Sequence, residues 1–351
     1  MKKMKVLFVA PFYPSFVLSD IQILRENFIV YVNHYPWQHK YLAPLFFFLQ
    51  FFSILINLIR VESIVISFGG YWSVWPVLLG KLFGKKTCII LHGTDCASIP
   101  ELNYGSLRLP LLKKACLISY RHASSLLPVS ESLTRTYLEF DPEIQHKSQG
   151  IHEHFPAINT RIIPIYNGFN PESWPFEGFE KKLAGTFIAV MSSPQYQLKG
   201  GDLIEEIAKM FPNLDFKIAG MDAPGNSCPA NLHFLGKIPQ YKLSEEYRNS
   251  RYYLQLSSFE GFGCALAEAM LSGCIPIGSS VNHIPSIIAG YGLILAKKDK
   301  HLLQKVIKQL LALDQPEEMS RKARQHIIKN YPLSLRKEKL SHLLNNHEEP
   351  I

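Results

Sequence analysis

The chain has 351 residues, 47% hydrophobic and 19% charged, a composition that excludes a disordered protein or a small module held together by disulfides or metal. The length predicts two domains, because a single core rarely exceeds about 250 residues. The net charge of +8 comes mostly from residues 1–170, which hold 16 Lys or Arg against 10 Asp or Glu; this basic half suits anionic membranes or phosphorylated substrates, and no nucleic-acid-binding motif is present.

The chain begins with lysines and the short apolar run VLFVA (6–10), which stops at Pro11. This run is too short for a signal peptide and is typical of a first buried strand. The six cysteines are scattered without a C-x-x-C pair, a pattern typical of reduced thiols. We therefore expect a cytoplasmic protein.

Short β-rich runs alternate with helix-length segments through the first half. The runs are KVLFVAPF (5–12), SIVISFGG (63–70), TCIILHGT (87–94) and SSLLPVS (124–130). Such alternation predicts a parallel sheet with helices on both faces.

One helix-length segment, residues 41–60, is almost wholly apolar. Its polar residues Gln50, Ser53, Asn57 and Arg60 are spaced by three or four and would form one narrow stripe on a helix. Three interpretations stay open: a buried helix of the first domain, a helix lying in the membrane interface on the cytoplasmic side, or a membrane span.

A second alternating series follows the polar stretch 158–185. Its predicted strands are TFIAVMSS (186–193), LDFKIAGMD (214–222), ANLHFLGKI (230–238), YYLQLSS (252–258) and CIPIGSS (274–280), and an amphipathic helix is predicted over 201–212. The chain thus reads as two doubly wound domains joined near residue 168. Ligands of such sheets bind beyond the carboxyl ends of the strands, so the cleft between the domains is the expected site.

The segment between the last two of these strands carries two carboxylates, Glu260 on the predicted turn and Glu268 one turn into the predicted helix. A helix starting near Cys264 would direct backbone N–H groups at a phosphate, and Gly261 and Gly263 would allow its close approach. Carboxylates repel phosphate but accept hydrogen bonds from sugar hydroxyls. The combination fits a nucleotide sugar.

The spacing alone also fits a simpler structure, in which Glu260 caps a turn and Glu268 lies on a solvated helix face. A nicotinamide cofactor is disfavoured, because G-x-G-x-x-L lacks the third glycine of the dinucleotide motif and no acid follows about 20 residues later.

Several segments together resemble family 4 of the retaining glycosyltransferases. They are LHGTD (91–95), YNGFNPESW (166–174), LKGGDLIEEIAKMFPNLDFKIAG (198–220), EGFGCALAEAM (260–270), GCIPIGSSVNHIPSII (273–288) and KNYPLSLRKEKLSHLL (329–344). The resemblance implies an α/β GT-B fold, with two Rossmann-like domains facing each other across a cleft. It implies an acceptor-side domain over 1–168, a nucleotide-sugar domain over 169–330, and a C-terminal helix over 331–351 that packs back on the first domain.

The resemblance also implies roles for single residues. Glu268 would hold the donor ribose and Glu260 would lie near the donor sugar. Lys199 would neutralise the departing diphosphate, and His92 would reach the sugar from the first domain, although a strand-end histidine satisfied by its neighbours fits the same position. Backbone groups of the turn would bind the donor's diphosphate and sugar, namely those of Gly261, Phe262, Gly263 and Cys264.

Two features depart from the family. An Arg usually stands five residues before the Lys, where this chain has Pro194, and the first loop is PFYPS (11–15) rather than a Gly-Gly pair. The missing Arg raises the alternative of weak donor binding or an inactive homologue.

Two charged clusters are expected to be solvated rather than functional. The histidines of the loop HKSQGIHEHF lack a firm fourth ligand for a metal, and the lysines of 297–300 are typical of a wet loop. The residues concerned are His146, His152 and His154 in the first cluster and Lys297, Lys298 and Lys300 in the second.

The function implied is a retaining, hexosyltransferase-type glycosyltransferase that moves a sugar from a nucleotide-diphosphate donor to a glycan or lipid-linked acceptor, in cell-envelope polysaccharide synthesis. No cofactor or metal is expected, and residues 41–60 are a candidate for peripheral membrane contact. The alternatives are a non-catalytic GT-B binding subunit and, less favoured, a GT-B epimerase or phosphorylase.

Overall fold

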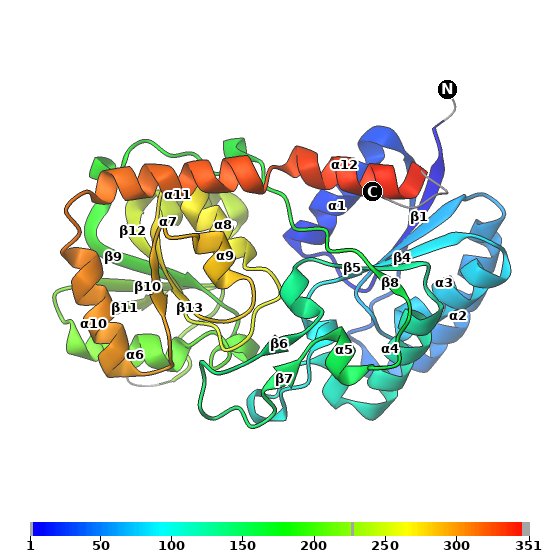
Figure 1. Cartoon of the computed structure of the whole chain (residues 1–351), viewed down its shortest axis with the longest axis horizontal. Coiled ribbons are helices and arrows are strands. Elements are labelled where there is room, and N and C mark those ends of the chain that lie inside the picture. Colours follow the sequence, from blue (N-terminus) through cyan, green and yellow to red (C-terminus); the bar gives the residue numbers. More distant parts are fainter. Residues whose placement is uncertain (1–2, 226–227, 346–351) are drawn as a thin grey trace. The chain divides into compact units, whose positions relative to one another are not determined.

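The computed structural model describes residues 3–225 and 228–345, and the chain forms two compact units (Figure 1). Unit 1 contains Met1–Thr136, Ser148–Asn167 and Ser334–Ile351, whereas unit 2 contains Tyr137–Lys147 and Gly168–Leu333. The expected join near residue 168 is one crossing between the units, but residues 137–147 of the first half belong to unit 2. Residues 346–351 of the expected C-terminal helix lie outside the described residues.

The sheet of unit 1 is parallel, with the strand order β2-β1-β3-β4-β5-β8. The predicted apolar runs are its central strands, and these strands are buried because helices cover both faces. The edge strands β2 and β8 were not predicted; β2 contains the β-rich run IVYV, whereas β8 has only two residues. The strands are β1 (Lys5–Ala10), β2 (Ile29–His34), β3 (Ser63–Ser67), β4 (Lys86–Leu91), β5 (Ser125–Pro128) and β8 (Arg161–Ile162).

The helices of unit 1 lie on the two faces of this sheet. The chain passes from β1 to the edge strand β2 through α1 and returns to β3 through α2, and right-handed crossovers in opposite directions put α1 and α2 on opposite faces. Helices α3 and α4 follow α2 along its face. The helices are α1 (Ser15–Asn27), α2 (Ala43–Leu58), α3 (Tyr71–Leu82), α4 (Pro110–His122), α5 (Ile151–His154) and α12 (Leu333–Asn345).

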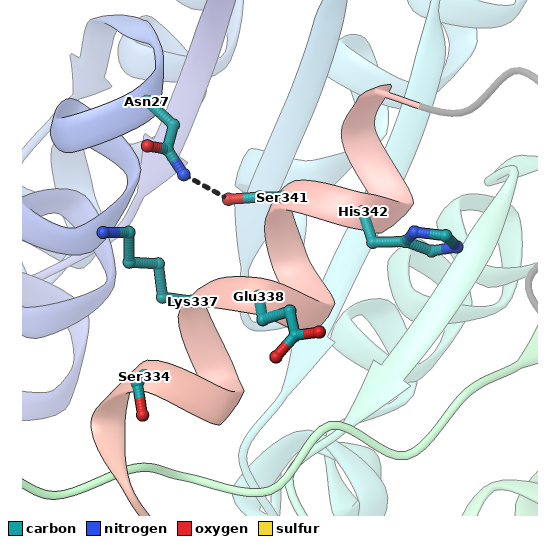
Figure 2. Close-up of a pocket in the computed structure, with 6 residues that line it drawn as sticks. All are labelled: Asn27, Ser334, Lys337, Glu338, Ser341 and His342. Carbon is teal, nitrogen blue, oxygen red and sulfur yellow. Dashed lines mark hydrogen bonds between the residues drawn. The ribbon is translucent and has the colours of Figure 1, made fainter.

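The C-terminal helix α12 packs beside α1 in unit 1. Arg336 is buried and makes a two-pronged ion pair with Asp20, with N–O distances of 2.6 and 2.7 Å. Its guanidinium also donates to the carbonyls of Ile165 and Tyr166. Figure 2 shows an open pocket along the seam between the helices, where Asn27 Nδ2 of α1 donates to Ser341 Oγ of α12 over 2.9 Å. The return of the chain to unit 1 therefore depends on a satisfied buried charge.

Unit 2 has a second parallel sheet, with the order β11-β10-β9-β12-β13-β14. The predicted strands are present, and the amphipathic helix predicted over 201–212 is α6, which buries Leu203, Ile204 and Ile207. The strands are β9 (Leu183–Val190), β10 (Asp215–Ala219), β11 (Leu232–Phe234), β12 (Ser250–Gln255), β13 (Ile275–Ser279) and β14 (Leu293–Leu295). The helices are α6 (Gly201–Met210), α7 (Gln240–Asn249), α8 (Cys264–Leu271), α9 (Ile284–Ile288), α10 (Lys300–Leu311) and α11 (Pro316–Asn330).

Two short strands, β6 (Thr136–Tyr137) and β7 (Ser148–Gln149), bracket the segment that the first half contributes to unit 2. The apolar stretch 41–60 forms a 3-10 turn (Lys40–Leu42) and α2, and only one face of α2 is buried. Across residues 3–225 and 228–345, no helix has both the length and the apolar character needed to cross a bilayer.

We expect Arg336→Leu to lower the free energy of unfolding by about 3 to 5 kcal/mol, because the change leaves the Asp20 carboxylate buried without its partner. Urea unfolding followed by circular dichroism measures the loss. The control Lys337→Leu removes an exposed pair with Glu26 and should change stability by less than about 1 kcal/mol.

The double variant Asp20→Leu/Arg336→Leu should recover part of the loss. A double variant as unstable as the single one would contradict the view that the unpaired carboxylate causes the damage.

Candidate functional site

The candidate site of unit 2 lies where β9 and β12 end. These strands pair in parallel, with Tyr253 opposite Ile188, so their carboxyl ends lie at the same edge of the sheet. The loop that follows each strand is therefore brought beside the other. The contact continues beyond the strands, where the Ser258 N–H donates to the Leu198 carbonyl over 2.7 Å.

Glu260, in the loop after β12, is held by hydrogen bonds from its own strand. Gln255 Nε2 donates to Glu260 Oε2 over 2.9 Å and to Ser257 Oγ over 2.7 Å, while the Tyr253 hydroxyl donates to Gln255 Oε1. The Glu260 N–H donates to Asn282 Oδ1 over 3.0 Å. Gln255 thus orients the Glu260 carboxylate, and Asn282 holds the Glu260 backbone.

Lys199, in the loop after β9, pairs with that carboxylate. Its Nζ lies 3.5 Å from Glu260 Oε2, and each side chain is only 16% exposed. The following Gly200 has φ +72°, and a Cβ there would lie 2.7 Å from the Leu256 carbonyl oxygen. Only glycine fits this turn, which explains why the Lys is followed by Gly. The family resemblance predicted Lys199 and Glu260 in one site, and the structure brings their side chains together.

Helix α8 begins at Cys264, as predicted. Its N-cap is Gly263 with φ +108°, and since glycine has no side chain, no side-chain oxygen caps the helix start. The backbone of this turn is buried at Gly261, Phe262 and Gly263. The positive end of the helix dipole thus lies at the end of the loop that carries Glu260.

Glu268 lies one turn into α8. Burial raises the pKa of its carboxyl to about 8, and the ammonium of Lys199 opposes that rise. Solvent still reaches part of the side chain, and within the described residues its carboxyl makes no hydrogen bond. The alternative of a solvated helix residue is therefore disfavoured: Glu268 is a largely buried carboxyl whose oxygens can accept from a ligand.

A buried charge cluster ties both loops to the rest of unit 2. Asp141, whose side chain is fully buried, accepts from Ser258 Oγ over 2.6 Å and from Lys298 Nζ over 3.1 Å. Lys298 Nζ also lies 3.0 Å from Asp202 Oδ2 in the first turn of α6. Asp141 thus supports the loop of Glu260, and Lys298 links it to the helix that follows Lys199.

Sequence reasoning missed this cluster. Lys298 was expected in a wet loop, yet its side chain is 9% exposed, because two carboxylates from distant segments surround it. Asp141 is 117 positions from Ser258, and no local pattern signals their contact. The buried position of Lys298 is a correction that only the tertiary structure supplies.

His92 lies in unit 1, directly after β4. Its Nε2 is 2.9 Å from Ser67 Oγ, and its ring packs against Phe68 and Phe16 with centroid distances of 4.2 and 4.7 Å. Burial, assisted by the positive charge of Arg336, lowers the pKa of His92 well below its usual value, so the imidazole is neutral. These are the contacts of a satisfied strand-end histidine, and a role in transfer stays a prediction.

The backbone after His92 is organised by Asp95. Its Oδ1 accepts from the N–H groups of His92 and Gly93, and its Oδ2 accepts from the Gly69 N–H. Burial raises the pKa of Asp95 to about 6, and these backbone donors limit the rise. The last residue of the motif LHGTD, Asp95, thus stabilises the turn of the motif by accepting from its backbone N–H groups.

The position of the missing Arg is occupied by a short 3-10 turn, Ser193–Gln195, which contains Pro194. Ser192 Oγ donates to Gln195 Oε1 over 3.1 Å, so these two side chains bond to each other. Within residues 3–225 and 228–345, no group of three or more His, Cys, Asp or Glu side chains is arranged to hold a metal ion.

Comparisons with known proteins match part of the chain to a glycosyltransferase family model and to one curated relative. Residues 201–330 match the family model described as glycosyl transferases group 1. The O-antigen chain mannosyltransferase B of Escherichia coli is 29% identical over 89 residues, which are 25% of this chain and 23% of the relative. The match thus spans about a quarter of that curated relative.

Solved structures resemble nearly the whole chain. The sucrose-phosphate synthase of Thermosynechococcus elongatus has a TM-score of 0.72 at 12% identity, over 97% of this chain and 98% of that one. Anabaena HepE in complex with UDP-glucose has a TM-score of 0.68 at 15% identity, over 97% of this chain and 99% of that one. A glycosyltransferase from Rickettsia africae has 0.70 at 15% identity, over 98% of both chains. At such identities the likeness shows the fold, which is GT-B.

The raised pKa of Glu268 predicts a pH dependence of stability. Between its ordinary pKa of 4.5 and about 8, the folded protein retains a proton that the unfolded chain has released, so the free energy of unfolding falls as the pH rises through this window. Glu268→Gln should reduce that fall. At pH 9 its free energy of unfolding should exceed that of the wild type by more than about 1.4 kcal/mol, the value of one pKa unit.

Urea unfolding at pH 5, 7 and 9 measures this difference. The control Glu245→Gln changes an exposed acid of α7 and should follow the wild-type curve. Parallel curves for Glu268→Gln and the wild type would show that the carboxyl ionises normally.

Proposed function

We propose that the protein is a retaining glycosyltransferase of family 4, which transfers a hexosyl group from a nucleotide-diphosphate sugar to a glycan or lipid-linked acceptor. The observation that carries this proposal is the Lys199–Glu260 pair in the loops beside the glycine-capped start of α8, with Glu268 one turn further along. A cation, a helix N-terminus and two carboxylates suit a molecule that has a diphosphate and sugars on both sides of it. The group 1 match over residues 201–330 and the GT-B fold support the same class.

The donor would be held in three parts. The ribose hydroxyls would donate to Glu268, whose desolvated carboxyl makes no competing hydrogen bond within the described residues. The diphosphate would lie at the backbone of Gly263 and Cys264, where the helix dipole is positive. The sugar hydroxyls would reach Glu260, which Gln255 and Asn282 already orient.

Transfer would break the bond between the anomeric carbon and the donor phosphate and form a bond to the acceptor oxygen on the same face. The acceptor proton would go to the departing phosphate oxygen. Lys199 would stabilise the negative charge that develops on the diphosphate, and its present partner Glu260 keeps the ammonium in place before the donor arrives. His92 would reach the donor sugar with its neutral imidazole.

The setting of the reaction would be cell-envelope polysaccharide synthesis in the cytoplasm, with no metal or cofactor needed and with membrane contact through residues 41–60. The solved relatives that contain UDP or UDP-glucose favour a nucleotide-sugar donor here. A second candidate function, a non-catalytic GT-B binding subunit, is favoured by one observation: Pro194 occupies the place of the family's Arg, so one phosphate-neutralising charge is absent.

A panel of UDP-, GDP- and ADP-sugars tests the proposal. One donor should raise the melting temperature of the purified protein, and the same donor should release free nucleotide when a lipid or glycan extract is added as acceptor. Donor binding without release under any pairing would support the binding subunit and contradict the transferase.

The two carboxylates should have separable roles. Glu268→Ala should weaken nucleotide binding by about 10- to 100-fold, the loss of two hydrogen bonds to its carboxyl, whereas Glu260→Ala should lower kcat with a smaller effect on binding. Isothermal titration with the nucleotide and steady-state kinetics separate the two effects. Glu245→Ala, on the exposed face of α7, is the matched control, and equal effects of all three substitutions would refute the assignment.

A further inference from the structure

Helix α2 of unit 1 turns its polar residues inward. Gln50 is fully buried, and its Nε2 donates to Asn33 Oδ1 over 3.1 Å and to the Trp72 carbonyl over 3.0 Å. Asn33 Nδ2 in turn donates to Ser53 Oγ over 2.9 Å, and Asn57 Nδ2 donates to the Ser53 carbonyl. The stripe that should meet water in an ordinary surface helix is therefore used for packing against β2 and α3.

The opposite face of α2 is apolar and exposed. Its side chains recur every three or four positions, so they form one continuous outer ridge, about 21 Å long from Leu45 to Ile59 at 1.5 Å per residue. Ile59 is 87% exposed and Phe48 59%. Water-facing helices carry polar residues on this side, so the outer ridge indicates a non-aqueous neighbour. Its members are Leu45, Phe48, Leu49, Phe52, Ile56 and Ile59, and Tyr41 and Leu42 precede them.

The end of α3 extends this surface. Parallel crossovers run α2 and α3 in the same direction, so their carboxyl-terminal ends lie at the same edge of the sheet, and the two helices are in contact. Leu82 at the end of α3 is 76% exposed and the adjoining Phe83 50%. The apolar surface thus continues from Ile59 to a neighbouring helix end.

The helices of this surface carry only basic charges. Helices α2, α3 and α4 contain Lys81, Lys113, Lys114 and Arg121 and no Asp or Glu. Arg60 lies two residues after the end of α2, and Lys85 lies three residues after the end of α3. The one acid close to Arg60 in the chain is Glu62, whose carboxylate accepts from the Lys5 N–H over 2.6 Å. Long basic side chains beside an apolar ridge can reach lipid phosphates while their stems stay in the apolar layer.

We propose that the outer ridge of α2, together with Leu82 and Phe83, lies in the headgroup region of a bilayer that contains anionic lipid. Helix α2 would lie parallel to the surface, with its apolar side chains inserted and with Arg60, Lys81 and Lys85 at the lipid phosphates. A second copy of the chain is disfavoured as the partner, because a symmetric contact would oppose the same cations from both copies. The inference rests on unit 1 alone and holds whether or not transfer occurs.

Sedimentation with vesicles tests the proposal. The full chain should bind vesicles of equal phosphatidylglycerol and phosphatidylcholine and should bind pure phosphatidylcholine far more weakly. The triple variant Phe48→Ser/Phe52→Ser/Ile56→Ser should lower the partition coefficient at least about 100-fold, since three inserted side chains are lost. The control Leu18→Ser/Leu311→Ser/Ile328→Ser changes exposed apolar residues of α1, α10 and α11 and should bind as the wild type does.

The basic residues are tested separately with Arg60→Gln/Lys81→Gln/Lys85→Gln. At about fivefold per residue, the loss on anionic vesicles should approach 100-fold, with little change on neutral ones. Lys305→Gln/Lys308→Gln/Lys329→Gln removes the same charge from α10 and α11 and should retain binding. Equal losses for the two triple variants would mean that only net charge matters and would overturn the proposed surface.

Melting curves by circular dichroism accompany each variant, and the exposed substitutions should leave the melting temperature within a few degrees. Should the serine variant not fold, Phe52→Trp keeps the face apolar: its added emission should shift to the blue on anionic vesicles and be quenched by lipids brominated near the headgroup. No quenching would overturn the proposal. The proposal would also be overturned if the protein did not bind vesicles and instead self-associated in a way that the serine variant abolishes. None of these measurements depends on donor binding, so failure here and failure of the proposed function are distinguishable.

Discussion

The pairing of β9 with β12 is the constraint on which the candidate site depends. These two strands come from segments about 60 residues apart, and only their parallel register brings the loop of Lys199 beside the loop of Glu260. The hydrogen bond from the Ser258 N–H to the Leu198 carbonyl keeps the two loops side by side beyond the ends of the strands. A slip of the register would separate the ion pair and the helix start that together make the site.

A buried ion pair stabilises this arrangement in unit 2, and a different buried ion pair holds the C-terminal helix in unit 1. Asp141 and Lys298 satisfy each other and hold Ser258, while Asp20 and Arg336 satisfy each other and hold α12. Each pair is stable because the remaining polar atoms also find partners, such as the Ile165 carbonyl for Arg336. Both pairs join segments more than 100 positions apart, and each makes a late segment of the chain depend on an early one.

Much of the fold was predictable because its signals are local. The central strands are unbroken apolar runs, and α6 shows its buried side as Leu203, Ile204 and Ile207 at helical spacing. The edge strands β2 and β14 were not predicted, although each contains a short apolar run, IVYV in β2 and LIL in β14. In the site, glycine and acid spacing pointed to α8 and its two carboxylates, but the burial that raises the pKa of Glu268 depends on neighbours such as Tyr253, which no spacing reveals.

The sequence by itself determined the central strands of both sheets, the turn that starts α8 at Cys264, and the unusual apolarity of residues 41–60, because each follows from residues near one another in the chain. Only the tertiary structure decided which side of α2 meets solvent and which lysine of 297–300 is buried. Both outcomes depend on distant partners. The Gln50 amide donates to Asn33 and Trp72. Lys298 pairs with Asp141 and Asp202. A side chain's exposure is set by what packs against it, and packing is a property of the fold rather than of the local pattern.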